Sequence, residues 1–194
     1  MNTDRHQTFN PFESRVCRDV RNHLGQSFLA ALPNGNMEPV LRDARRVAPA
    51  DADDVISAYV DTRVERYRAV LTTIRSADTP FPDAWVIALL LWDQELFFEC
   101  HEWLEMTWRR REGAEKKMIQ ALILAAGAYS HLSYGRADQA RKLAARAVAG
   151  LTRYRELVPG LFDLDMLVRK LESLDSVPPK FGPPGSASSA FSGS

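Results

Sequence analysis

The sequence predicts an all-α protein: a helical bundle built around a long central antiparallel helix hairpin, with extra helices at the N-terminus. Apolar residues recur mostly three and four positions apart, which is the spacing of one face of a helix. No persuasive run alternates apolar and polar residues, and proline and glycine separate the apolar stretches. The 194 residues are enough for one domain with a substantial core.

The first part of the chain is predicted to be helical but to lie outside the central bundle. Residues 1–10 are expected to be a flexible N-terminus, and residues 11–80 an N-terminal helical section packed on the bundle. Apolar residues at helical spacing place the first helix, and Asp51 is the expected N-cap of the third. The expected helices are 12–32, 38–47 and 51–74.

Residues 81–175 are expected to form the bundle core. The segment 84–111 is apolar almost all round, which predicts one long, enclosed helix that Gly113 stops. After Ser176, proline, glycine and serine replace the apolar period, so residues 176–194 are expected to be a disordered tail. The expected helices of the core are 84–111, 116–134, 137–157 and 163–174.

Composition bears on the partners and the compartment. Lys+Arg and Asp+Glu are both 25, so the net charge of +0 does not favour nucleic acid or an anionic membrane. The longest apolar runs, 85–92 and 121–129, are far shorter than the ~20 residues that span a bilayer, and the N-terminus has no signal-peptide core. Cys17 and Cys100 do not suggest a disulfide framework, so a cytoplasmic protein is expected.

A group of polar side chains interrupts the apolar segment LFFECHEWLE, residues 96–105. Burying a carboxylate or an imidazole group costs free energy unless another group pairs with it. On one continuous helix, Glu95, Glu99 and Glu102 would share a stripe, and an antiparallel hairpin would bring His131 to it. The candidate site residues are Glu95, Glu99, His101, Glu102, Glu105, Trp108, Gln120 and His131.

Two hypotheses follow for these residues, and the sequence leaves open whether the protein is an enzyme. In one, the protein binds a metal or a small ligand: Glu99, His101 and His131 bind a divalent transition metal, and Glu102 or Glu105 acts as a base, as in a hydrolase. Gln120 would then orient a substrate or water. In the other, the same residues form a buried polar network that fixes helix register in a non-enzymatic interaction or scaffold protein.

The order of these residues also resembles a known family. An aromatic residue, then Glu-x-His-Glu-x-x-Glu and Trp108, then Gln-x-Leu-Ile from Gln120 and a second histidine at His131, resembles the family called domain of unknown function 309, over about residues 81–174. The chain departs from the family pattern after Gly135. The resemblance implies an all-α bundle, a homo-oligomer such as a dimer, and a polar cluster of unassigned chemistry.

Overall fold

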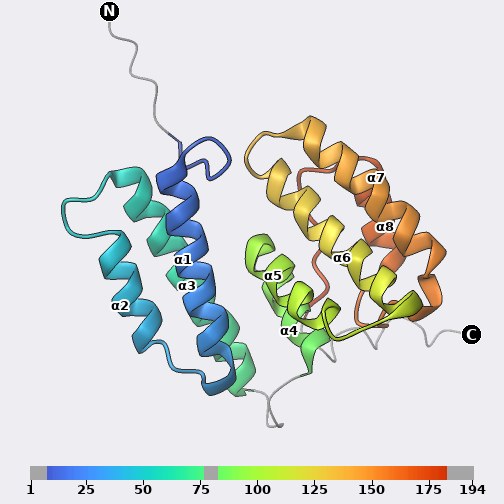
Figure 1. Ribbon diagram of the computed structural model, residues 1–194, viewed down its shortest axis with the longest axis horizontal. Helices are drawn as coiled ribbons and strands as arrows, with labels where there is room; N and C mark the ends of the chain where they lie inside the picture. The colour runs from blue at the N-terminus through green and yellow to red at the C-terminus, as the bar shows by residue number, and fades with distance from the viewer. Residues whose placement is uncertain (1–7, 77–82, 183–194) are drawn as a thin grey trace, which may run out of the picture. The chain divides into compact units, whose positions relative to one another are not determined.

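The computed structural model of the protein describes residues 8–76 and 83–182 (Figure 1). The all-α prediction is confirmed for these residues, which form eight α-helices, two short 3-10 helices and no strand. The chain divides into two compact units, Met1–Asp78 and Thr79–Ser194. The helices of the first unit are α1 (Arg15–Ala31), η1 (Leu32–Asn34), α2 (Glu38–Val47) and α3 (Asp54–Ser76).

Local side-chain caps set the ends of the helices in the first unit. The Ser14 hydroxyl accepts a hydrogen bond from the Cys17 amide and so begins α1. The third helix begins after Asp53, whose carboxylate accepts from the Val55 amide at 2.8 Å, and not at Asp51 as the sequence suggested. In the core, the rings of Phe28 and Tyr67 stack with centroids 3.9 Å apart, and neither side chain is exposed.

The second unit is arranged around α6, a helix enclosed on two sides. Figure 1 shows α6 between α5 and α7, and it packs against both. Nine of its 20 residues are buried, and they lie between Met118 and Tyr129. Gly150 lets α7 approach closely, because a Cβ there would lie 2.6 Å from Ala121 Cβ. The helices are α4 (Ala84–Asp93), α5 (Phe97–Trp108), α6 (Gly113–Leu132), α7 (Ala137–Arg153), η2 (Arg155–Leu157) and α8 (Leu164–Glu172).

The expected single helix over residues 84–111 is instead two helices joined at a sharp turn. Glu95 has a φ of 54°, in the left-handed region. The Leu96 amide donates to the Leu91 carbonyl and the Glu95 amide to the Trp92 carbonyl, which is the Schellman pattern that ends a helix. This turn starts α5 in a new direction, so Glu95 does not share a helical stripe with Glu99.

The sequence predicts a disordered tail from residue 176 onward, but the structure describes residues 176–182 as a segment packed on the second unit. Residues 175–182, here called the C-terminal strap, leave α8 and run back to the end of α4. The Trp92 indole N–H donates to the Pro179 carbonyl at 2.9 Å, and Pro179 is buried. A composition that cannot build its own core can still pack on one that exists already. The rest of the expected tail, 183–194, and most of the expected flexible N-terminus, 1–7, lie outside the described residues.

The helices differ from membrane spans in length and in charge. The longest, α3 with 23 residues, carries several charged side chains. Within residues 8–76 and 83–182, no helix combines the length and the hydrophobicity needed to cross a bilayer.

The close approach of α6 and α7 predicts that two glycine-to-alanine substitutions change the stability of the protein differently. Gly150→Ala is expected to lower the free energy of unfolding by about 1–2 kcal/mol, because overpacking against Ala121 exceeds the gain in helix propensity. Gly127→Ala is the matched control: its new methyl group would meet only Leu143 Cδ1 at 3.4 Å, so stability should stay the same or rise by up to about 1 kcal/mol. Urea denaturation measures both, and equal effects would contradict the packing argument.

The strap predicts a pH dependence centred on Asp93. Burial raises the pKa of this carboxyl, against the lowering effect of the Phe181 and Gly182 amides and of Lys180. Because the folded state binds the proton more tightly, the contribution of Asp93 to stability is present below the unfolded pKa of about 3.9 and is lost as the pH rises through the folded pKa. The stability advantage of wild type over Asp93→Asn should therefore shrink from pH 4 to pH 7 in urea denaturation. An Asp93 carboxyl resonance titrating below about 3.9 would contradict this sign.

Candidate functional site

The candidate site residues lie on two helices of the second unit, α5 and α6, and at the turn between α4 and α5. Most lie on α5, which begins after the turn at Glu95 and follows α4 back along its length. Gln120 is exposed on α6, and His131 lies half-buried near the end of the same helix. On α5, Glu99 is buried, whereas the other candidates are half-buried: His101, Glu102, Glu105 and Trp108.

Glu99 differs from the other carboxylates of the segment by its burial. Its exposed fraction is 0%, whereas the side chains of Glu102 and Glu105 are 35% and 34% exposed. A carboxylate removed from water is tolerated only when other groups satisfy it. Glu99 does make interactions with other residues, so its side chain is a part of the packed interior.

The remaining charged groups of α5 form weak, half-exposed pairs. His101 Nδ1 lies 3.3 Å from Glu102 Oε1. Glu105 Oε2 lies 3.3 Å from Arg109 Nη2 one turn later, at the spacing where side chains on a helix surface are neighbours. Solvent screens such pairs, so each contributes little to stability. The apolar neighbours of His101 and Glu105 in the sequence predict that these two are the most enclosed polar groups of the segment, but both are less buried than Glu99.

Two polar side chains on α5 hold it against α4. The Trp103 indole N–H donates to the Ala84 carbonyl at 2.8 Å, and Cys100 Sγ lies 3.4 Å from the Ala88 carbonyl. Burial raises the pKa of the Cys100 thiol, and the charge of Glu99 raises it further. The thiol therefore stays protonated, and a protonated, buried thiol is a poor nucleophile.

Trp103 was not among the sequence-predicted site residues, although its signal was present. A tryptophan removed from water needs an acceptor for its indole N–H, and a helix carbonyl can provide one because its second lone pair is available. Trp108 has a different environment: Lys116 Nζ lies 4.2 Å from its ring centroid. Its indole nitrogen is buried and makes no hydrogen bond to the residues that the structure describes.

The arrangement gives no support to metal ligation. Among the described residues, no group of three or more His, Cys, Asp or Glu side chains is placed to hold a metal ion. Glu99, His101 and His131, the expected ligands, therefore do not form such a group. Gly127 of α6 faces Leu143 of α7.

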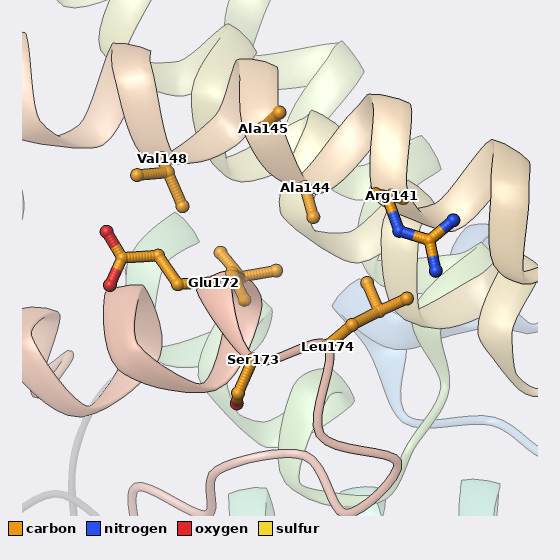
Figure 2. A pocket seen from close by; sticks show the side chains of 8 residues that line it. Arg141, Ala144, Ala145, Val148, Glu172, Ser173 and Leu174 are labelled. Carbon is orange, nitrogen blue, oxygen red and sulfur yellow. The ribbon is translucent and has the colours of Figure 1, made fainter.

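Two pockets lie away from the motif. One, of about 460 Å³, lies between α7 and the end of α8 (Figure 2). Figure 2 places Arg141 at one end of it and Glu172 at the other, with alanine, valine and leucine side chains between them. Arg141 is already bonded to Asp138 at 3.0 Å. The other pocket, of about 710 Å³, lies between α2 and α3 in the first unit.

Comparison with known proteins agrees with the resemblance seen in the sequence. Residues 85–143 match the model of the family described as Domain of unknown function (DUF309). The match begins in α4, includes all of α5 and α6, and ends within α7. It confirms the predicted resemblance for this segment and brings no assigned activity. No curated protein and no solved structure matches the chain.

The burial of Glu99 predicts a large loss of stability when it is replaced. Glu99→Ala is expected to lower the free energy of unfolding by about 2–5 kcal/mol, because it removes a fully enclosed side chain together with the interactions that this side chain makes. Glu102→Ala, three residues away and half-exposed, is the matched control and should change stability by about 0.5 kcal/mol or less. If urea denaturation gives both variants similar stability, Glu99 does not have the structural role argued above.

Proposed function

We propose that this protein is a non-enzymatic helical interaction protein that acts as a homo-oligomer, and that its Glu/His motif fixes the architecture of the α4–α5 hairpin. The observation that carries this proposal is that the motif residues make contacts within the α4–α5 hairpin. Glu99 is enclosed, and Cys100 and Trp103 bond to carbonyls of α4. Groups bound in this way are not available to a substrate.

Support for self-association comes from the apolar side chains of α5. Met106 is 40% exposed, and Trp103, three residues earlier on the same face, is half-buried. Interfaces between protein copies favour methionine and aromatic side chains at their centres. A second copy of the chain is therefore the partner proposed for this face.

A cytoplasmic location is part of the same proposal. Cys17 and Cys100 are both buried and free, with no disulfide between them. Free buried thiols in both positions are compatible with a reducing compartment.

The homo-oligomer is tested by the molar mass in solution. Light scattering after size-exclusion chromatography should give twice the 21.8 kDa of the chain for wild type. Met106→Glu places a charge on the exposed α5 face and should shift the protein to the monomer mass without unfolding it. Val16→Glu is the matched control: Val16 is 58% exposed on α1, so its replacement should leave the mass unchanged.

Two results would contradict the proposal. A monomeric wild type at every concentration up to its solubility limit would remove the homo-oligomer. A stoichiometric transition metal, found by elemental mass spectrometry of protein purified without chelators and lost in both Glu99→Ala and His131→Ala, would instead favour the metal-binding hypothesis.

A further inference from the structure

The C-terminal strap is held at the end of α4 by contacts to its main chain. The Asp93 carboxylate accepts from two successive amides, those of Phe181 at 2.9 Å and Gly182 at 2.8 Å. The Trp92 indole N–H donates to the carbonyl of Pro179, two residues before Phe181. Three main-chain groups within four residues are thus bonded to two adjacent side chains of α4.

Two side chains of the strap are also recognised. The Phe181 ring lies 5.9 Å from the Trp92 ring and 5.1 Å from the Phe162 ring, measured between centroids. Lys180 Nζ donates to the Asp93 carbonyl at 2.6 Å and to Glu95 Oε1 at 2.9 Å. The left-handed turn at Glu95 places this carboxylate beside the end of α4, within reach of a lysine on the strap.

These contacts have the form of a peptide-recognition site. Proline-rich segments commonly dock on aromatic side chains, because their extended conformation is already formed and little entropy is lost on binding. Here the segment Pro179-Lys-Phe-Gly182 presents a carbonyl, a cation, an aromatic ring and two amides. The carbonyl, the cation and the two amides meet complementary groups at the α4–α5 junction, and the Phe181 ring lies against Trp92 of α4 and against Phe162.

We propose that the α4–α5 junction is a peptide-recognition site for a Pro-Lys-Phe-Gly segment. This chain fills the site with its own strap, and the strap of a second copy fills it by exchange. The inference rests on the interaction role proposed above and gives that role a second contact, separate from the exposed face of α5.

The connection to α8 favours exchange between copies. The strap begins after Leu174, a non-glycine residue whose φ of 51° carries a conformational cost. Strained connections of this kind favour domain swapping, in which an identical element moves to a second copy and keeps all of its contacts. Because the exchanged strap has the same sequence, the second copy is the partner whose fit the contacts already demonstrate.

The first experiment measures whether the site binds its segment as a separate molecule. In full-length Lys180→Glu/Phe181→Ala, the strap loses its cation and its ring, and the junction keeps Trp92, Asp93 and Glu95. A fluorescent peptide of residues 176–182 should bind this variant at least about tenfold more tightly than wild type, whose own strap competes at an effective concentration of roughly millimolar.

The controls separate recognition from unspecific binding. A peptide with the same two substitutions should not bind. Adding Asp93→Ala to Lys180→Glu/Phe181→Ala, here called the unlatched variant, should abolish binding of the natural peptide. Circular dichroism melting verifies that each variant is folded. A folded, unlatched variant that does not bind the natural peptide would overturn the recognition site.

The second experiment tests exchange between copies, in a Met106→Glu background that disables the proposed α5 face. Asp93→Ala keeps a natural strap but has a disabled site, whereas Lys180→Glu/Phe181→Ala keeps a natural site but has a disabled strap. The mixture should form a heterodimer, and neither variant alone should dimerise. A mixture that stays monomeric would overturn exchange. The mass of wild type tests the proposed homo-oligomer separately, so the two failures are distinguishable.

Discussion

Glu95 takes up a left-handed backbone conformation at the end of α4, and the amides of Glu95 and Leu96 bond back to carbonyls of that helix. A conformation that is costly for a non-glycine residue persists only where its surroundings compensate it. Here the turn reverses an apolar segment on itself, so that α5 packs on α4 and buries Leu91 and Leu96 together. The position of every motif residue on α5 depends on this reversal.

The reversal also decides what the polar residues of α5 can do. It brings the Trp103 indole N–H to the Ala84 carbonyl and Cys100 Sγ to within 3.4 Å of the Ala88 carbonyl, so two side chains of α5 bond to the main chain of α4. It leaves Glu99 enclosed, and His101 and Glu102 at the half-exposed side of the same helix. The motif could be taken for a catalytic or metal centre, but some of its residues are enclosed in the core and others lie at the half-exposed side of α5. The interaction role proposed above is based on this difference in burial.

The same turn prepares the end of α4 as a receptor for the strap. Trp92 is nearly fully buried, yet its indole N–H needs an acceptor, and the Pro179 carbonyl supplies one. Asp93 is left at the last position of the helix, where its carboxylate meets two strap amides. Bonds from amides to a carboxylate are stronger than bonds between neutral groups, which explains how a short segment with no core of its own is held in place.

The sequence by itself determined the features that depend on near neighbours. The helical class follows from apolar spacing, and Ser14 and Asp163 cap α1 and α8 through amides three residues away. Gly135, in the left-handed region, follows the end of α6 as expected. The resemblance to the family, confirmed for residues 85–143, likewise needed only the order of residues.

Only the tertiary structure decided the break at Glu95, the full burial of Glu99 and the docking of the strap. A glutamate gives no local signal for a left-handed turn. This backbone conformation is unfavourable for a residue other than glycine, and the packing of α5 on α4 compensates its cost in free energy. Burial of one carboxylate among four depends on which side of α5 other elements cover, and spacing alone leaves several sides equivalent. The strap has the composition of a disordered segment, and it is ordered because Trp92 and Asp93, more than 80 residues earlier, provide the partners that its own neighbours lack.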